Sequence, residues 1–334
     1  MHNETEHFQR IRNHPIFICG HPKAGTSLVR AILDSHPELI VYPEESMFFR
    51  RFLPKTRNCK LDEKLDLAEK NIINFFRWEQ ENPTADQEGF PDRDYRNFSF
   101  EEINKWMRTF VENSFRDDGD ILSAAVLAFG VVSNQLHQNT RYWVEKSPYN
   151  EYYAEQIFTW WSDARCIHVI RDPRDNYISY KRKHPDWQAE FFASNWRCST
   201  LAGVQNQEKY KPENYYILHY EDLTSSPENA IRQLTAFLKI SWDETLLIPS
   251  RAKELWKGNS MFSNQFEGIS AAPVARWKEN LSRQDAEVIQ IITEPLFTQF
   301  KYSDGEIEQK ISGKARWRAR SWPLRRRLQR FYQA

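Results

Sequence analysis

One stretch constrains the fold more than any other, residues 16–37, IFICGHPKAGTSLVRAILDSHP. It predicts a buried strand, a polar turn that contains Gly20 and Gly25, and then an amphipathic helix. A strand that ends in such a turn directs backbone N–H groups and the positive end of the helix dipole toward one point. The sequence therefore predicts an α/β fold with a loop suited to binding a phosphate.

A lysine inside this turn distinguishes it from the loop that binds nucleoside triphosphates. That loop has the pattern GxxxxGK[ST], with the lysine directly after the second glycine and a hydroxyl that binds magnesium. Here Gly20 and Gly25 keep the spacing, but Thr26 takes the lysine position and Lys23 lies within the loop. A lysine there would face the group beyond the bound phosphate and neutralise charge on a leaving oxygen without a metal. A merely polar strand-to-helix turn is the plainer alternative.

The remaining strand-like runs point to a parallel sheet. Short apolar or β-branched runs, each followed by helical periodicity, occupy residues 15–20, 141–146, 165–172 and 214–223. Strands that alternate with helices imply a P-loop-like, mainly parallel sheet flanked by helices on both faces. The region from about 50 to 140 has few strand signals and predicts a helical insertion. We expect a single α/β domain over residues 1–313, followed by a basic helix or tail over 314–334.

Charge and composition exclude several classes of protein. Lysine plus arginine equals aspartate plus glutamate at 46 each, so no global charge favours a nucleic-acid partner. No apolar run approaches the roughly 18 residues of a membrane span, and no signal segment is recognisable, so we expect a soluble, cytoplasmic protein. The four cysteines are widely spaced and lack the CxxC pairs of a zinc site, which predicts reduced thiols and no metal.

The C-terminal segment GKARWRARSWPLRRRLQRFYQA is dense in arginine. After Pro323, the side chains on one helical face are apolar and those around it are basic (Leu324, Leu328 and Phe331, with Arg325, Arg326, Arg327 and Arg330). This pattern is typical of a terminal helix that docks by its apolar stripe. The alternative is weak contact with a membrane surface or another polyanion.

Two motifs together resemble the sulfotransferases that use 3′-phosphoadenosine 5′-phosphosulfate (PAPS). The segment GHPKAGTSLVRAILDSHPEL is similar to the loop with which that family binds the 5′-phosphosulfate, which implies a binding role for Pro22, Lys23, Ala24, Gly25, Thr26, Ser27 and Leu28. The segment VIRDPRDNYISY is similar to the family's second motif, which implies that Arg171 and Ser179 bind the 3′-phosphate. Physically, the strand CIHVI delivers Arg171 to the carboxyl edge of the sheet, and Asp172 and Pro173 cap and start the helix that presents Ser179.

Two later segments resemble the same family less closely. The run LHYEDL implies that Tyr220 contacts the adenosine, although Tyr220 could equally be a core aromatic. The run PVARWKENLS resembles a loop that covers the 3′-phosphate, which implies roles for Arg276, Trp277 and Lys278. The family's glycine before that arginine is Ala275 here. The resemblance covers residues 16 to 282 at four points, and about 50 to 140 match no motif.

The resemblance also bears on which group accepts the proton of the acceptor. Many cytosolic members place a histidine after the second strand, but VEKSPYN contains none and is similar to a segment of bacterial and protein-tyrosine sulfotransferases. That similarity implies that Lys146 and Ser147 orient the sulfonate. In the tyrosine-directed branch the base is a glutamate after the first helix, and the run HPELIVYPEES places Glu44 there, with Glu45 beside it. A solvated acidic turn is the alternative, and His36 is a weaker candidate base.

The sequence thus predicts an O-sulfotransferase without a metal. PAPS and the hydroxyl of a carbohydrate or small-molecule acceptor would give a sulfate ester and adenosine 3′,5′-bisphosphate (PAP). The alternatives are a P-loop kinase or nucleoside triphosphatase, and a catalytically silent nucleotide- or polyanion-binding protein that uses the arginine tail. Several aromatic residues could line the acceptor pocket or form the core of the insertion (Phe48, Phe49, Phe75, Phe76 and Trp78).

Overall fold

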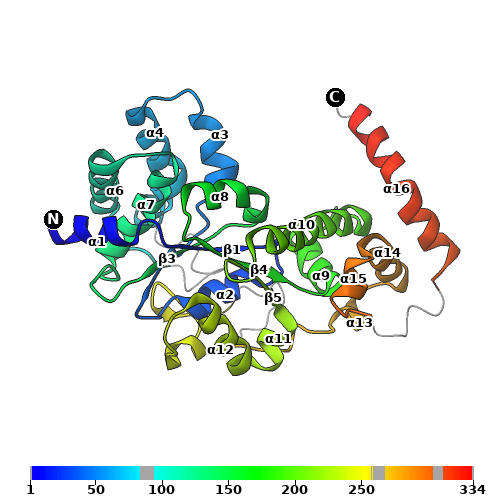
Figure 1. Ribbon diagram of the computed structural model, residues 1–334. Helices are drawn as coiled ribbons and strands as arrows, with labels where there is room; N and C mark the ends of the chain where they lie inside the picture. The colour runs from blue at the N-terminus through cyan, green and yellow to red at the C-terminus, as the bar shows by residue number, and fades with distance from the viewer. Residues whose placement is uncertain (1, 83–93, 257, 259–267, 304–310, 333–334) are drawn as a thin grey trace.

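A five-stranded parallel sheet forms the centre of the molecule in the computed structural model (Figure 1). The structure describes residues 2–82, 94–256, 258, 268–303 and 311–332; for residues 2–3 and from 324 onward it describes only the backbone. The strand order is β2-β3-β1-β4-β5, with strands β1 (Pro15–Cys19), β2 (Leu39–Val41), β3 (Tyr142–Lys146), β4 (Arg165–Ile170) and β5 (Tyr215–His219). Four of these match the strands expected from the sequence. The short β2 was not expected, because three apolar residues give too little pattern to distinguish a strand from a loop.

Alternate residues of β1 enter two different cores. Phe17 and Cys19 pack on one face of the sheet with α7 (Gly119–Val132) and α8 (Ala154–Trp160). Ile16 and Ile18 pack on the other face, against α2 (Thr26–Leu33), α11 (Tyr220–Ser225) and α12 (Pro227–Leu238). Because both faces are covered, every residue of β1 is apolar and buried. The expected P-loop-like α/β fold with helices on both faces is therefore confirmed.

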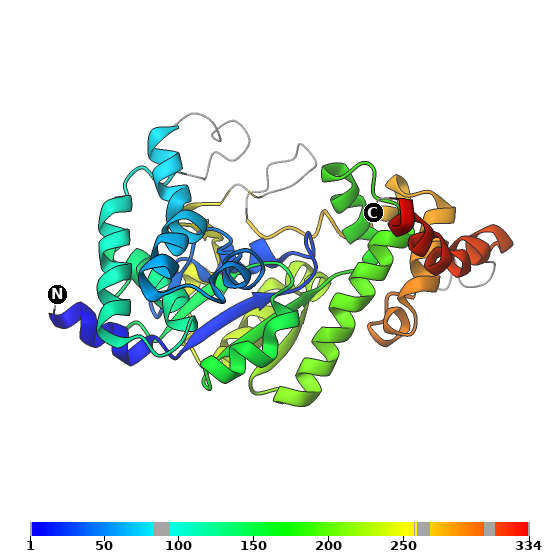
Figure 2. The ribbon, with the colours of Figure 1, turned by 90° about the horizontal axis from the view of Figure 1, so that it is seen from above.

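Helices fill the chain between β2 and β3, as the sequence predicts. They are α3 (Leu53–Thr56), α4 (Leu61–Ala68), α5 (Asn74–Glu81), α6 (Phe100–Ser114) and α7, with short π-helical turns η1 (Phe48–Phe52) and η2 (Glu69–Ile73) between them. Figure 2 shows this group, with α1 (His2–Ile11), along one side of the sheet. Its aromatic side chains continue the core that begins at Phe17. Whether this region and the rest form one domain over 1–313 stays a prediction.

The chain after β4 builds the opposite side of the molecule. It contains α9 (Pro173–Lys183), α10 (Ala189–Tyr210), a two-stranded hairpin of β6 (Ser250–Arg251) and β7 (Glu254–Leu255), α13 (Trp277–Asn280), α14 (Arg283–Thr293), α15 (Leu296–Gln299) and α16 (Gly313–Tyr332). Arg318 of α16 donates hydrogen bonds to Glu190 of α10 at 2.9 and 3.0 Å. The expected apolar stripe from Leu324 to Phe331 lies outside the described side chains.

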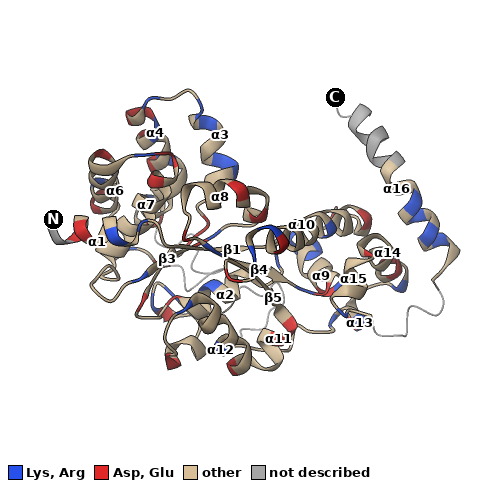
Figure 3. Ribbon diagram, viewed as in Figure 1, with Lys and Arg blue, Asp and Glu red and all other residues tan. Residues whose placement is uncertain are grey.

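Charges of both signs are interspersed over the helices, with several lysines and arginines on α16 (Figure 3). The same mixture underlies the equal totals of basic and acidic residues. In the described part of the chain, no helix is both long enough and apolar enough to cross a membrane.

Candidate active site

The loop between β1 and α2 has the backbone geometry of an anion-binding turn. Gly20, Lys23 and Gly25 all have positive φ, at 127°, 67° and 110°. A Cβ atom on Gly25 would lie 2.4 Å from the ring of Tyr220, so glycine is required there for contact as well as conformation. The backbone N–H of Gly20 donates to Glu151 Oε2 at 3.0 Å, which fixes the start of the loop. Burial raises the pKa of that carboxyl to about 7.

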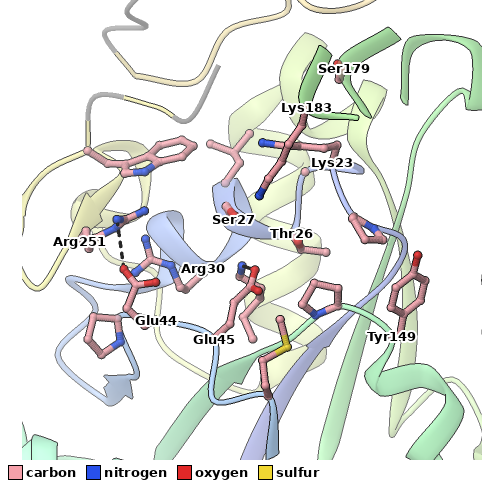
Figure 4. Close-up of a pocket in the computed structure, with 18 of the residues that line it drawn as sticks. Lys23, Thr26, Ser27, Arg30, Glu44, Glu45, Tyr149, Ser179, Lys183 and Arg251 are labelled. Atoms are coloured by element: carbon pink, nitrogen blue, oxygen red, sulfur yellow. Dashed lines mark hydrogen bonds and ion pairs between the residues drawn. The ribbon is translucent and has the colours of Figure 1, made fainter. Parts of the chain in front are cut away.

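A cavity of about 920 Å³ opens above this loop. Figure 4 shows side chains from α2, the segment after β2, α9 and the β6–β7 hairpin entering it. Thirteen of the residues singled out in the sequence line the cavity: Pro22, Lys23, Gly25, Thr26, Ser27, Leu28, Glu44, Glu45, Lys146, Arg171, Ser179, Tyr220 and Arg276. Strand order explains the convergence, because β3, β1, β4 and β5 are neighbours and their carboxyl ends meet at one edge.

Arg171 ties three segments together at this edge. Its guanidinium donates to the carbonyl of Lys23 at 3.3 Å, to Ser179 Oγ at 3.4 Å and to the carbonyl of Pro273 at 2.8 Å. It lies 4.5 Å from the ring centre of Tyr220, and its buried Nε has no hydrogen-bond partner in the described part of the chain. Asp172 caps α9 as expected and accepts from the N–H of Arg174 at 2.8 Å.

The segment that contains Arg276 is held by a buried aspartate. Asp175 accepts from the backbone N–H groups of Ala275 at 2.6 Å and Trp277 at 2.8 Å. Burial raises the pKa of Asp175 to about 6. Ala275 has a φ of 61°, which is the left-handed conformation that glycine adopts most easily. Ala275, which stands where the family has glycine, therefore adopts the same left-handed turn, at a cost in backbone strain.

Three residues of the predicted binding set do not line the cavity. Ala24 is buried within the loop. Trp277 packs against Arg174, with 3.8 Å between the guanidinium carbon and the centre of the Trp277 ring. Lys278 is exposed, and its Nζ lies 5.8 Å from the centre of the same ring. The residues of α13 thus support the position of Arg276 and do not line the cavity themselves.

Three lysines converge near the loop. Burial lowers the pKa of Lys23 to about 8, and the positive charges of Lys183 and Lys146 add to the effect. Figure 4 shows Lys23 and Lys183 extending into the same part of the cavity, with Glu45 below Thr26 and Ser27. The Lys23 ammonium is therefore held where negative charge on a bound group would be favoured.

Glu45 and Lys146 form a close ion pair with a distance of 2.5 Å between Oε1 and Nζ. The buried carboxylate of Glu145 positions this pair, because it accepts hydrogen bonds from Ser46 Oγ at 2.6 Å and from Ser147 Oγ at 2.6 Å. Ser147 also accepts from the N–H of Met47 at 3.0 Å. Ser147 therefore links the segment that contains Glu45 to the end of β3 by hydrogen bonds. The expectation that its hydroxyl orients a sulfonate has no support in this geometry.

Glu44 faces a different part of the cavity. Its Oε1 accepts from the hydroxyl of Tyr95 at 2.7 Å and from Arg251 at 3.4 Å, the ion pair drawn in Figure 4. Arg30 of α2 lies beside this pair. His36 is buried outside the cavity, where its Nε2 is 2.9 Å from the carbonyl oxygen of Ser241.

The aromatic residues of the helical region divide between core and cavity. Phe48, Phe49 and Phe76 are buried in the core, as the plainer interpretation predicts. Phe75 and Trp78 line the cavity together with residues that sequence analysis did not single out: Arg30, Tyr95, Tyr149, Lys183, Arg251 and Trp256. Only Arg30 carried a sequence signal, as a charged residue within the apolar run LVRAIL.

Comparison with known proteins identifies related chains. A family model described as the sulfotransferase family matches residues 15–244. The chain is 27% identical over 304 residues to an uncharacterised protein of Aquifex aeolicus and 26% identical over 238 residues to protein-tyrosine sulfotransferase A of Caenorhabditis elegans. These alignments cover 88% and 70% of this chain, but the chain spans only 34% and 51% of the two relatives.

A solved structure shares the fold. The sulfotransferase domain from the Synechococcus PCC 7002 olefin synthase superimposes with a TM-score of 0.57 at 21% identity, covering 88% of this chain and 96% of that domain.

Proposed function

The chain belongs to the sulfotransferase family, and we propose that it transfers the sulfuryl group of PAPS to a hydroxyl of a carbohydrate or other small acceptor. The observation that carries this proposal is the convergence of the loop, Arg171, Ser179 and Arg276 on one cavity that also holds Lys23, Lys146 and Glu45. We call the first group the donor half of the cavity. We call the residues around Arg30 (with Glu44, Tyr95, Arg251 and Trp256) the acceptor half.

The donor half fits a nucleotide with phosphates at both ends. Among the described residues, the buried Nε of Arg171 has no hydrogen-bond partner, and the ring of Tyr220 packs directly against Gly25. We propose that the loop N–H groups with Thr26 and Ser27 hold the 5′-phosphosulfate. Arg171, Ser179 and Arg276 would hold the 3′-phosphate, for which a guanidinium is well suited. PAPS supplies an activated sulfuryl group whose leaving group is a phosphate.

In the proposed reaction the acceptor oxygen forms a bond to sulfur while the bond from sulfur to the 5′-phosphate oxygen breaks, and that oxygen keeps the electron pair. The products are a sulfate ester and PAP. Lys23 would neutralise the charge that develops on the departing oxygen, and Lys146 and Lys183 would stabilise the transferred group. Their nearness to one another, which helps to lower the pKa of Lys23, supports this role.

We propose Glu45 as the group that accepts the proton of the hydroxyl. Its charge acts directly on Lys23, and its carboxylate is oriented by Lys146, so it lies close to the proposed transfer point. Glu44 is engaged by Tyr95 and Arg251 on the far side of the acceptor half. The two adjacent carboxylates would therefore have different tasks.

Isothermal titration with PAP, AMP and ATP with magnesium tests the donor site. We expect PAP to bind at least tenfold more tightly than AMP, because the 3′-phosphate adds charge-assisted hydrogen bonds to Arg171. Arg171→Ala should abolish this preference. Arg197→Ala, which removes an exposed arginine on α10, is the matched control and should keep it.

The other outcomes separate the alternatives. Tightest binding of ATP with magnesium, followed by its turnover, would establish the kinase or triphosphatase. Tight PAP binding with no PAP release from PAPS across hydroxylated acceptors would favour the silent binding protein, and salt-sensitive binding that is lost on deletion of 314–334 would assign it to the tail.

A further inference from the structure

Arg30 is a buried cation on the wall of the cavity. It is 1% exposed, and its two terminal nitrogens, Nη1 and Nη2, have no hydrogen-bond partner among the residues that the structure describes. Asp34 is the carboxylate whose charge acts most strongly on Arg30, but it accepts hydrogen bonds from the hydroxyl of Ser250 at 2.8 Å and from the N–H groups of Ala252 and Lys253 at 3.1 and 2.8 Å. A buried charged donor without an acceptor costs free energy. This wall therefore lacks an oxygen acceptor.

The same wall carries a second buried donor. Within the described parts of the chain the indole Nε1 of Trp256 has no hydrogen-bond partner, and Trp256 lines the cavity together with Arg30 and Arg251. Figure 4 shows the guanidinium groups of Arg30 and Arg251 on the same side of the cavity as Glu44. The terminal nitrogens of Arg30 match the two oxygens of a carboxylate.

The charge of the whole cavity favours an anion. Among the described residues, its lining includes three glutamates (Glu44, Glu45 and Glu79) but ten basic side chains (Lys23, Arg30, Arg50, Arg51, Lys70, Lys146, Arg171, Lys183, Arg251 and Arg276). Five of these are assigned to the donor and the transferred group. The five others line the remainder of the same cavity. The formal net charge of the whole chain is zero. This excess is local and would attract a negatively charged acceptor.

We propose that the acceptor carries an oxyanion, in the first instance a carboxylate, which binds to Arg30 with support from Arg251 and Trp256 Nε1–H. This inference rests on the proposed function and specifies that the acceptor molecule is negatively charged. Arg30 would bind the acid group, while the hydroxyl of the same molecule lies toward Glu45. The acceptor would therefore be a hydroxy acid or an acidic sugar.

Titration of the PAP-saturated protein tests this site, because PAP occupies the phosphate contacts of the donor half. The probes are 4-hydroxybenzoate, 4-hydroxyphenylacetate and 3-(4-hydroxyphenyl)propionate, each beside its neutral amide, and glucuronate beside glucose. The series varies the spacing between hydroxyl and acid. We expect at least one acid to bind about tenfold or more tightly than its neutral partner. The sulfonate of 4-hydroxybenzenesulfonate distinguishes a tetrahedral oxyanion from a planar carboxylate.

Variants of the cavity wall should change the preference for an acid over its neutral partner in opposite directions. Arg30→Lys and Trp256→Phe should reduce it, and Glu44→Gln should increase it because one competing negative charge beside Arg251 is removed. Retained PAP affinity and thermal unfolding temperature would verify that each variant is folded. If every acid binds like its neutral partner, or no acid binds, the inference is wrong even when PAP binds tightly. Failure of PAP binding would instead overturn the proposed function.

Discussion

The donor half of the cavity is built mainly on turns that follow neighbouring central strands, whereas the acceptor half also depends on the helical region and on a short hairpin. Lys23, Arg171 and Tyr220 follow β1, β4 and β5, and each lies where a strand ends at the same edge of the sheet. In the acceptor half, by contrast, Arg251 pairs with a glutamate 207 residues away, from a hairpin strand of two residues.

The hydrogen bonds of the two halves differ as well. In the donor half, Arg171 binds two backbone carbonyls and Asp175 binds two backbone N–H groups, so the binding shape is preformed. In the acceptor half, Arg30 and Trp256 have N–H donors that no described residue pairs with. We infer that the protein fixes its nucleotide contacts in advance and leaves part of the acceptor wall to be completed by the substrate.

The largest expected effect comes from Lys23, the lysine in the loop of the donor half. Lys23→Ala should lower kcat for PAP release from PAPS about a thousandfold, because it removes the charge that stabilises the leaving oxygen. Lys209→Ala, which removes an exposed lysine of α10 that does not line the cavity, is the control. Steady-state kinetics with a screened acceptor measure both. An unchanged kcat in Lys23→Ala would show that this lysine contributes to binding PAPS but not to the transfer step.

The two adjacent glutamates sharpen the comparison. Glu45→Gln should lower kcat about a hundredfold by removing the proton acceptor, while Glu44→Gln should act mainly on the KM of the acceptor. Both substitutions keep the volume of the side chain, which makes them a matched pair. The reverse pattern, with kcat lost in Glu44→Gln, would move the base into the acceptor half.

The smallest expected effect is a shift in the pH dependence of kcat/KM for PAPS. Burial, assisted by Lys183, lowers the pKa of Lys23 to about 8, and the lysine is charged only below that pH. The kcat/KM for PAPS at saturating acceptor should therefore fall as the pH rises through about 8. Lys183→Met removes one of the positive charges that lower this pKa, so the limb should move upward by a fraction of a pH unit. If the pH limb of Lys183→Met stays in place or moves downward, the charge of Lys183 does not lower the pKa of Lys23.

Sequence analysis predicted the donor half because its determinants are local. A glycine-containing turn, a cap at Asp172 and a serine two helical turns later each follow from neighbouring residues. The positions of Trp277 and Ser147 were not predictable in this way, because each depends on a partner elsewhere, Arg174 and Glu145. The strand β2 was missed for the same reason, since its pairing with β3 defines it.

By itself, the sequence determined the α/β class, the glycine-containing loop with Lys23 and the family to which the chain belongs. Only the tertiary structure decided that Glu45 lies toward Lys23 and Lys146 while Glu44 faces Arg251, and that Arg30 lies buried in a cavity wall. The physical reason is that a strand and its turn are specified by short-range periodicity and backbone conformation. The surroundings of a charged side chain depend instead on which distant segments pack against it.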